Sequence, residues 1–494
     1  MARARRRKAS KSESAEKSLS ATAIVGLAEK AQLKLFHSPL REPYASLWVK
    51  DHWETWQIKS PAFEEWLSAM CYFQHGGVPC QQTLGAARNT LAGRALFGGP
   101  EERVYVRLSG HKGAIYVDLG NGSWQAVRIT REGWDIVSHV PVKFVRAPGM
   151  QAMPHPTDGG TIDDLRPLLN LPDEDQWKLA VSWLIGAFRP DGPFPILVVE
   201  GTHGSAKSSC AKMLRALVDP NMSPLRAGPT NLRDLAISAA NSWCLGFDNL
   251  SAVRPALSDA LCRLSTGGGF STRLLYTDGG EKIFEGMRPM LLNGIDIGIE
   301  RADLLDRTIT LSLPPIAEEA RQTESELWTR FEALCPSILG SVFDAVACAL
   351  RRRSDVTLMK LPRMADFAIW VCAAEPALGW SEGSFLKAFD RNRADANAVA
   401  LEGSSLVQPI VRIAERGPWN GTPTELLHEL AEELDELGQR LLPKTPRQLS
   451  QELRRLAPNL PASGITVAFG KTSGNNSERV ITISKSGDGA TLRR

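Results

Sequence analysis

The sequence contains few cysteines and pairs none of them closely: eight are scattered through 494 residues, and no two form a Cys-x-x-Cys pattern. A disulfide framework is therefore not indicated, and the thiols are typical of a reducing, cytoplasmic compartment. One cluster, Cys71, His75 and Cys80, offers three metal-ligand residues without an evident fourth. Because structural zinc sites use four protein ligands, ordinary thiols are the favoured interpretation and a metal site the alternative.

Long apolar runs and an excess of one charge are also missing. No stretch approaches the roughly 18 apolar residues that cross a bilayer, so no transmembrane helix is predicted. The charged N-terminus has no apolar run behind it, which argues against a secretory signal. With 58 Lys/Arg against 55 Asp/Glu, the formal net charge is only +3. Any contact with nucleic acid must therefore come from local basic patches.

The length and composition indicate a soluble protein of several domains. Domains of ordinary size would divide 494 residues into roughly three or four units. The first twenty residues hold seven Lys/Arg against two Glu, and nothing there can form a core, so residues 1–20 are predicted to be a disordered basic arm. Two interpretations of the arm stay open: it contacts the phosphate backbone of DNA, or it is a solvated tail.

Residues 21–150 are predicted to form an α+β domain. Segments with helical periodicity come first, and short segments that alternate apolar and polar residues between Gly/Asn turns follow. A primase active site would need paired carboxylates on strands, whereas Asp118 in "IYVDLGNG" stands alone. Asp118 is therefore interpreted as a strand-end residue before a turn, and the domain is not assigned a polymerase function.

The boundaries of the remaining regions follow from composition. A Pro/Gly-rich stretch at 147–160 predicts a linker, so residues 151–195 are a linker and helical lead-in to the motif region. Residues 317–400 follow the motifs and are predicted to be helical. In residues 401–485, amphipathic helices precede a strand, a polar turn and a second strand, with Thr445 and Pro446 as the start of the last helix. This order is the outline of a winged helix, and 486–494 is a tail.

A glycine loop between a buried strand and a helix is the first chemical motif. The strand covers 196–199 and a helix begins at about Ser208, so backbone N–H groups and the helix N-terminus would form an anion site. Lys207, expected to be an exposed loop residue, would reach the β- and γ-phosphates of ATP, and the Ser208 hydroxyl would join a magnesium shell. The predicted nucleotide-binding residues are Gly201, Thr202, His203, Gly204, Ser205, Ala206, Lys207, Ser208 and Ser209.

Ala206 departs from the phosphate-loop pattern. The pattern GxxxxGK[ST] has glycine at this place. Alanine is accommodated there if its φ is negative, and minichromosome maintenance helicases have the same Ala-Lys-Ser ending. Taken alone, the loop leaves open the alternative that glycine, lysine and serine follow this strand by chance.

Three later segments favour the nucleotide site. "SWCLGFDNLS" is an apolar strand that ends in Asp248, a carboxylate suited to magnesium, and the neighbouring Asn249 can orient water but cannot take a proton. "RPMLLNGI" ends in Asn293, which can sense the γ-phosphate. Arg307 precedes a fourth strand, where it could reach a neighbouring subunit's ATP; its alternative role is a salt bridge to Asp303 or Asp306.

The order GTHGSAKS, LGFDN, RPMLLNGI and DRT resembles superfamily-three helicases, and more narrowly the primase-helicase ATPases of phages, plasmids and integrated elements. The resemblance covers residues 196–316 and implies an AAA+ core, a hexameric ring and ATP-driven movement along DNA. By position, it makes Lys207 and Ser208 the Walker A pair, Asp248 the Walker B carboxylate that shares Mg²⁺ with Ser208, Asn293 the motif C asparagine and Arg307 the candidate finger. Asn249 departs from the acidic pair usual in the family.

The resemblance also places a channel-lining hairpin between Asp248 and Asn293. There, Arg273 and Lys282 are candidates for holding single-stranded DNA, with Phe270 or Tyr276 for base stacking; the alternative is a hairpin of no special role.

A basic patch at 440–485 carries a local net charge of +6 and suits duplex DNA through Arg447, Arg454 and Arg455, unless it packs on the ring instead. Its members are Arg440, Lys444, Arg447, Arg454, Arg455, Lys471, Arg479 and Lys485, against Glu452 and Glu478.

Two functions are consistent with these features. The first is a cytoplasmic, ATP- and Mg²⁺-dependent DNA helicase of an α/β, P-loop AAA+ type, acting as a homo-hexamer in replication of a mobile element, with a separate primase as a candidate partner. The second is an ATP-gated DNA-binding initiator or defence-system ATPase without processive unwinding. Asn249 favours the second slightly, whereas the set of Lys207, Asp248, Asn293 and Arg307 favours the first.

Overall fold

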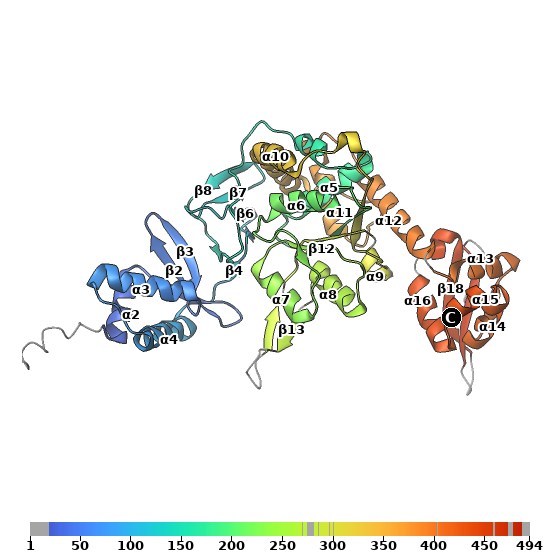
Figure 1. The fold of residues 1–494 in the computed structure, drawn as a ribbon, viewed down its shortest axis with the longest axis horizontal. Coiled ribbons are helices and arrows are strands. Elements are labelled where there is room, and N and C mark those ends of the chain that lie inside the picture. The colour runs from blue at the N-terminus through green and yellow to red at the C-terminus, as the bar shows by residue number, and fades with distance from the viewer. Residues whose placement is uncertain are drawn as a thin grey trace, which may run out of the picture.

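The computed structural model describes residues 19–268, 270–273, 281–284, 286–295, 297–299, 301–402, 404–457, 460–472 and 478–486. A large central part lies between a smaller N-terminal part and a smaller C-terminal part (Figure 1). Of the predicted basic arm, only Leu19 and Ser20 are described. Ser20 caps the helix that begins at Ala21, because its side chain accepts a hydrogen bond from the backbone N–H of Ala23.

Among the described residues, three helices and a three-stranded antiparallel sheet form the N-terminal part. Ser60 caps α3 and Pro61 occupies its first turn, while Gly76, with φ of 63°, ends the helix in the left-handed conformation. The apolar faces of the helices and one face of the sheet share a core of their own, which includes Ile24, Phe63 and Leu91. The elements are α2 (Ala21–Lys30), β1 (Lys34–His37), β2 (Pro43–Val49), β3 (His52–Gln57), α3 (Pro61–His75) and α4 (Gln81–Gly98).

A second antiparallel sheet follows but packs against the central part. Leu108, Val117 and Val127 belong to the same hydrophobic cluster as the central helices, and the Trp134 ring lies edge-on to Phe343 at a centroid distance of 6.0 Å. Core residues therefore divide near residue 100 rather than near 150, the expected end of the first domain. The strands are β5 (Leu108–His111), β6 (Ala114–Asp118), β7 (Ala126–Ile129) and β8 (Trp134–Val137), beside the parallel pair β4 (Val104–Tyr105) and β9 (Lys143–Phe144).

The predicted linker of 147–160 is packed against the central part. Met153 is buried, and its N–H donates to the Leu119 carbonyl. Further along, the Thr157 N–H donates to Pro336. The segment then enters the 3-10 helix η1 (Ile162–Leu168), and the lead-in helix α5 (Glu174–Gly186) crosses the core.

The central part is built on a five-stranded parallel sheet in the order β11-β12-β15-β10-β16. The glycine loop follows β10, which lies between β15 and β16. Both faces are buried: Leu197 and Val199 point into one hydrophobic cluster, Ile196 and Val198 into another. Such continuous apolar strands are typical of parallel sheets covered by helices. The strands are β10 (Ile196–Gly201), β11 (Arg226–Ala227), β12 (Leu245–Asp248), β15 (Met290–Gly294) and β16 (Thr308–Leu313).

The helices of the central part cover this sheet, and a hairpin projects from it (Figure 1). The hairpin, β13 (Phe270–Arg273) and β14 (Glu281–Phe284), is antiparallel and pairs Thr272 with Lys282. The helices are α6 (Lys207–Val218), α7 (Leu232–Asn241), α8 (Pro255–Thr266) and α9 (Ala302–Leu305). The predicted α/β class is confirmed, and the structure adds that the central sheet is parallel.

The helical region after β16 contains the longest helix among the described residues, α10 (Glu324–Arg352), followed by α11 (Ala365–Ala374) and α12 (Ser384–Glu402). By length and composition α10 could cross a membrane, with a mean hydropathy of 1.8, although no such stretch was expected. However, 67% of the apolar 18-residue stretch within α10 is buried inside the fold. Its hydropathy follows from packing against α11 and η1 in the core.

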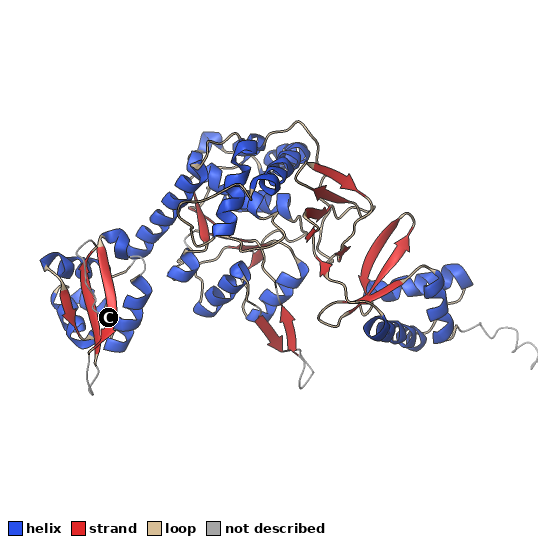
Figure 2. Cartoon of the chain, turned by 180° about the vertical axis from the view of Figure 1, so that it is seen from behind, coloured by secondary structure: helices blue, strands red, loops and turns tan. Residues whose placement is uncertain are grey.

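The C-terminal part has its own core, including Ile410, Leu449 and Ile483. A three-stranded antiparallel sheet lies beside its helices (Figure 2). In that sheet β19 is the middle strand. It pairs with β17, which follows α13, and with β18, its partner in the hairpin. The elements are α13 (Val407–Arg416), β17 (Trp419–Gly421), α14 (Pro423–Glu432), α15 (Glu436–Leu441), α16 (Pro446–Leu456), β18 (Ile465–Lys471) and β19 (Arg479–Lys485).

Candidate functional site

The glycine loop turns sharply between β10 and α6. A Cβ at Gly201 would lie 2.5 Å from Ser205 Oγ and 2.7 Å from the Leu313 carbonyl oxygen, so only glycine fits there. Gly204 has φ of 77°, in the left-handed region that favours glycine. The loop thus ends at the N-terminus of a 12-residue helix, where free backbone N–H groups attract an anion.

Ala206 adopts φ of 58° and ψ of 24°, so the negative φ that would accommodate alanine at this position is not present. The backbone changes direction at Ala206 as it enters α6. It does so through the left-handed conformation. An L-residue with a Cβ pays roughly 1–2 kcal/mol for that conformation, which glycine avoids. This conformational cost explains why the usual phosphate-loop pattern has glycine at this position.

We predict that Ala206→Gly relieves this strain. The gain is partly offset by the larger unfolded-state entropy of glycine, leaving a net stabilisation of about 0.5–1 kcal/mol in urea unfolding. Ala211→Gly is the matched control, because Ala211 lies inside the same helix and its replacement should cost about 1 kcal/mol. Equal losses of stability in the two variants would contradict the strain at Ala206.

Contacts from distant segments hold the loop, and the sequence alone did not indicate them. Asn170 Nδ2 donates to the carbonyls of Ser205 (3.1 Å) and Pro314 (2.6 Å), and the Ile316 N–H donates to the Gly204 carbonyl (3.1 Å). Arg321 also lies close, with Nη2 3.9 Å from the position of a Cβ on Gly204. No local motif marks these residues, because each contact joins segments far apart in the chain.

Ser208, Asp248 and Asn293 meet at the carboxyl ends of three strands. Asn293, fully buried, donates from Nδ2 to Ser208 Oγ at 2.9 Å and to Asp248 Oδ1 at 2.5 Å. Ser208 Oγ lies 3.4 Å from Asp248 Oδ1. Lys207 is half-buried and is the first residue of α6 rather than an exposed loop residue; its Nζ donates to the Thr202 carbonyl at 3.4 Å.

These residues fit a nucleotide with magnesium. Adjacent ligands of an octahedral Mg²⁺ stand about 3 Å apart, and the hydroxyl and carboxylate oxygens here are close to that spacing. Among the described residues, the buried Asn293 Oδ1 and Ser205 Oγ have no hydrogen-bond partner. Two such orphaned polar atoms beside a helix N-terminus are typical of a site that binds a polar ligand.

Asn249 lies beside this cluster but turns away from the core. It is exposed, with φ of 53°, and its backbone N–H donates to Asp248 Oδ1 at 3.0 Å. Asparagine tolerates the left-handed conformation better than most residues. The carboxamide can orient water, but it supplies no base.

Arg307 lies at the amino ends of the parallel strands, opposite to the carboxyl ends where Ser208, Asp248 and Asn293 meet. Its carbonyl accepts from Ile196 at the start of β10, so about 15–20 Å of strand separates it from the glycine loop of its own chain. Its side chain is 12% exposed and bonds to the carbonyl and carboxylate of Asp303, the partner that the alternative interpretation named. Burial raises the pKa of Asp303, but Arg307 and Arg363 outweigh this and hold it below its usual value.

Arg363 and Arg393 extend this ion-pair network. Arg363 contacts Asp303 at 2.6 Å and Asp306 at 2.9 Å, and Arg393 contacts Asp306 at 3.2 Å. Asp303 therefore keeps a cationic partner if Arg307 moves away. The sequence did not indicate this feature, because Arg363 and Arg393 come from the helical region.

The predicted channel hairpin is described only in part. Arg273 pairs in register with Glu281, and Phe270 with Phe284. Tyr276 lies outside the described residues. The DNA contacts of Arg273 and Lys282 stay predictions.

The C-terminal basic patch contains a hollow between α16 and the hairpin of β18 and β19. Arg454 lies over the Phe469 ring at 4.1 Å from its centroid. Arg447 and Arg454 are exposed, and the Arg455 side chain is not described. The hollow has a volume of about 490 Å³ and is lined by Arg454, Phe469, Gly470, Lys471 and Arg479.

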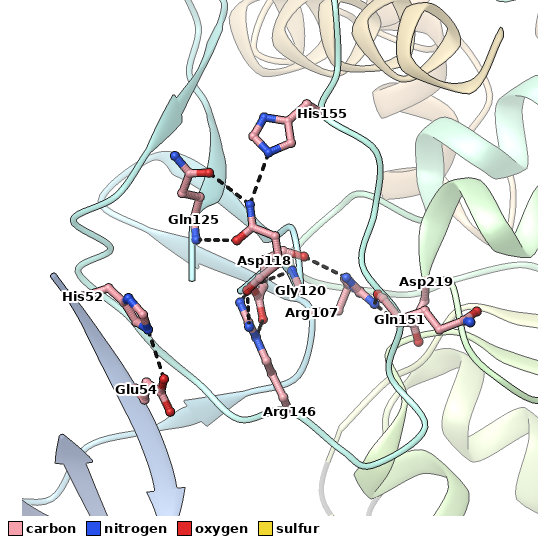
Figure 3. A network of polar contacts seen from close by, with 11 residues as sticks. His52, Glu54, Arg107, Asp118, Gly120, Gln125, Arg146, Gln151, His155 and Asp219 are labelled. Atoms are coloured by element: carbon pink, nitrogen blue, oxygen red, sulfur yellow. Dashed lines mark hydrogen bonds and ion pairs between the residues drawn. The ribbon is translucent and has the colours of Figure 1, made fainter. Parts of the chain in front are cut away.

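The N-terminal candidates behave as structural residues. Asp118 ends β6, accepts the Gly120 N–H at 2.9 Å and pairs with Arg146 at 2.6 Å (Figure 3), in agreement with a strand-end residue before a turn. In the described part of the chain, no group of three or more His, Cys, Asp or Glu residues could hold a metal ion. Cys71 is buried, and burial raises its pKa, whereas Cys80 is exposed.

The fold and site define an α/β protein with a glycine loop at the carboxyl edge of a parallel sheet. Residues 162–395 match the family described as actinomycete integrative conjugative element replication protein. Residues 406–491 match the family described as the AICE RepA C-terminal domain. Over these two stretches the chain is similar to the AICE RepA replication proteins, and this similarity supports a role related to replication.

Similarity to solved structures is weak. A structure titled the A form apo structure of the NrS-1 C terminal region is 9% identical, with a TM-score of 0.42, and the match covers 94% of this chain and 99% of that chain. Another NrS-1 C terminal region structure is 13% identical with a TM-score of 0.41, covering 93% and 98%. A ligand-bound JCV helicase is 12% identical with a TM-score of 0.22, covering 45% and 66%. At these values the three structures do not indicate a function for this chain. No curated protein matches the chain.

Proposed function

We propose that this chain is a DNA-dependent ATPase of helicase type that works as a ring, with an AAA+ core and a C-terminal winged helix, in replication of an integrative conjugative element. The observation that carries the proposal is the meeting of Ser208, Asp248 and Asn293 at the N-terminus of α6. The family match supports the biological setting. The hexamer follows from the family resemblance of the sequence.

In the proposed reaction the protein binds phosphate and polarises it. Backbone N–H groups from Gly204 to Ser208 would surround the phosphates, and Lys207 would place its charge against the γ-phosphate. Ser208 and Asp248 would hold Mg²⁺, which supplies Lewis-acid stabilisation of the phosphate oxygens when bound. Asn293 would keep the Ser208 hydroxyl and the Asp248 carboxylate in register through its two hydrogen bonds.

A strand-displacement assay tests the proposal. On a forked DNA substrate, the protein with ATP and Mg²⁺ should release the labelled strand, whereas a non-hydrolysable ATP analogue should support binding without release. DNA should also raise the rate of ATP hydrolysis. Hydrolysis without any strand release would favour the initiator described next.

An ATP-gated DNA-binding initiator is the second candidate, and Asn249 favours it. An amide cannot accept the proton of the attacking water, so a slow ATPase would suit a switch of assembly better than a motor. In that case, the non-hydrolysable analogue should support full assembly and DNA binding. An Asn249→Asp variant should then hydrolyse ATP faster than the parent protein.

We predict that Arg307 completes the ATP site of a neighbouring subunit. Arg307→Ala and Lys207→Ala proteins should each be inactive, but an equal mixture should recover about a quarter of the parental ATPase, because one site in four joins an intact half from each protein. The measurement is steady-state phosphate release across mixing ratios. Arg301→Ala is the matched control: Arg301 is a nearby, partly exposed arginine that pairs with Asp259 at 2.8 Å, and this variant should keep its activity without mixing. A mixture that never exceeds its components would assign Arg307 to the Asp303 salt bridge.

We predict that the C-terminal part binds duplex DNA. Removing residues 406–494 should weaken duplex binding and flatten its salt dependence while basal ATPase survives, since the C-terminal core is separate. Replacing Arg447 and Arg454 together with alanine should lower the slope of log affinity against log salt by about two. Arg416→Ala is the matched control, because this exposed arginine pairs with Glu433. An unchanged slope would move the duplex contact elsewhere.

A further inference from the structure

The hairpin of β2 and β3 carries two tryptophans opposite each other. Trp48 pairs in register with Trp53, and the two rings meet edge to face with centroids 5.3 Å apart. Trp48 is 36% exposed and Trp53 is partly exposed. The hairpin projects away from the helices of the N-terminal part (Figure 1). A pair of large aromatic rings therefore lies at a surface that the described residues do not cover completely.

The two faces of the hairpin differ in character. Alternation along β3 places Glu54 and Trp56 on the face opposite to Trp53. On that face, Trp56 Nε1 donates to Glu54 at 2.8 Å, and His52 contacts the same carboxylate at 3.0 Å (Figure 3). The Glu54 carboxylate is thus engaged away from the tryptophan pair. An anion at the tryptophan pair would therefore lie across the sheet from this carboxylate.

Lys34 supplies positive charge on the tryptophan face. Its Nζ lies 3.9 Å from the centroid of the Trp53 ring. Lys50 is also exposed, next to the turn. The neighbouring Asp51 carboxylate is exposed as well, and a hydrogen bond of 3.1 Å ties it to His52. The surface therefore combines partly exposed aromatic rings with lysine ammonium groups.

We propose that Trp48, Trp53 and Lys34 form a binding site for single-stranded DNA, separate from the proposed ring channel and the C-terminal duplex contact. Unstacked bases present ring faces to tryptophan, while phosphates pair with lysine, and this combination binds single strands with little sequence preference. A protein partner that covered the same rings would bury the Lys34 ammonium, which is costly without a matching carboxylate. Duplex DNA offers no free base faces for stacking.

The site also differs from a purely structural aromatic pair. Cross-strand aromatic pairs stabilise hairpins by contact between their rings alone. Such a role requires neither a cation over the ring nor exposure to solvent. An experiment must therefore measure DNA contact and hairpin stability separately.

Photo-cross-linking on the full-length protein locates the contact. Single-stranded DNA with 5-iodouracil is irradiated with the protein in the absence of nucleotide, and the tryptic peptides are sequenced by mass spectrometry. Trypsin separates Trp48, in peptide 42–50, from Trp53, in peptide 51–59. We expect adducts on both tryptophans, and the same adducts with the ATPase-deficient Lys207→Ala protein. Adducts confined to other peptides would overturn the proposal.

Substitutions then measure the contribution to affinity. Trp53→Ala should weaken binding of a fluorescent single strand by about fivefold or more, Trp53→Phe should restore most of it, and duplex affinity should not change. Phe73→Ala is the matched control, because Phe73 is 83% exposed and pairs with Tyr72 on α3. Thermal unfolding of each variant reports hairpin stability. If Trp53→Ala lowers only the unfolding temperature and leaves affinity intact, the pair is structural and the proposal fails.

Discussion

Lys207→Ala should lower ATP turnover by at least about a hundredfold, comparable to the loss of one transition-state donor in other enzymes. Lys207 begins α6, at the place where the phosphates of a bound nucleotide would lie. The side chain is half-buried, and its Nζ contact with Thr202 is long, at 3.4 Å. Folding should therefore be almost unaffected, with a change in unfolding temperature of less than about 2 °C. Phosphate release and thermal unfolding on one preparation measure both effects.

Lys212 is the matched control for this experiment. It lies in the same helix and pairs with Glu324 at 3.4 Å, on the surface and away from the loop. Lys212→Ala should keep parental turnover, because exposed ion pairs contribute little. Parental turnover in Lys207→Ala would remove the glycine loop from the proposed reaction. Loss of turnover in both variants would point to a general defect of α6.

Arg107→Met should destabilise the protein by about 3–5 kcal/mol, the usual cost of removing one partner of a buried ion pair. Arg107 is completely buried, and its Nε donates to Asp219 at 2.9 Å. The guanidinium also donates to the carbonyls of Asp118 and Gln151 (Figure 3). Methionine fills a similar volume but leaves the Asp219 carboxylate buried without its cation. Thermal unfolding should shift down by about 10 °C.

The consequence should extend to the ATP site. Asp219 caps the end of α6, and its Oδ2 accepts the backbone N–H groups of Trp243 and Cys244, which lead into β12. The same carboxylate thus joins the helix that begins at Lys207 to the strand that ends in Asp248. Hydrogen exchange of β12 should therefore increase in the Arg107→Met protein.

Arg128→Ala is the matched control for Arg107→Met. Arg128 pairs with Asp135 at 2.8 Å on the same sheet, but 44% and 48% of their side chains are exposed. Its loss should cost less than about 1 kcal/mol. In a double-mutant cycle, Arg107→Met with Asp219→Asn should cost less than the sum of the two single changes. Equal, small effects of Arg107→Met and Arg128→Ala would show that burial does not strengthen the Asp219 pair.

Much of the local structure followed from the sequence, because neighbouring residues determine it. An apolar run that leads into a glycine loop indicates a buried strand followed by a helix, and the structure has β10 and α6 at that place. The alternation at the C-terminal end likewise predicted the hairpin of β18 and β19. The roles of Lys207, Asp248, Asn293 and Arg307 stay predictions until the variants are measured.

The sequence by itself determined that Ser208, Asp248 and Asn293 follow or end apolar strands. In a parallel sheet the carboxyl ends of such strands lie at the same side, so these residues come together there. The tertiary structure alone decided the left-handed Ala206, the contact of Asn170 with the loop and the pairing of Arg107 with Asp219. It also decided that the sheet of β5 to β8 packs on the central core rather than on the N-terminal helices. The physical reason is that the contacts of Asn170 and Arg107 and the packing of this sheet join residues tens to more than a hundred positions apart, which no local pattern of hydrophobicity or turn residues encodes. At Ala206 the reason is local, because the residue type does not show that the backbone enters α6 through the left-handed conformation.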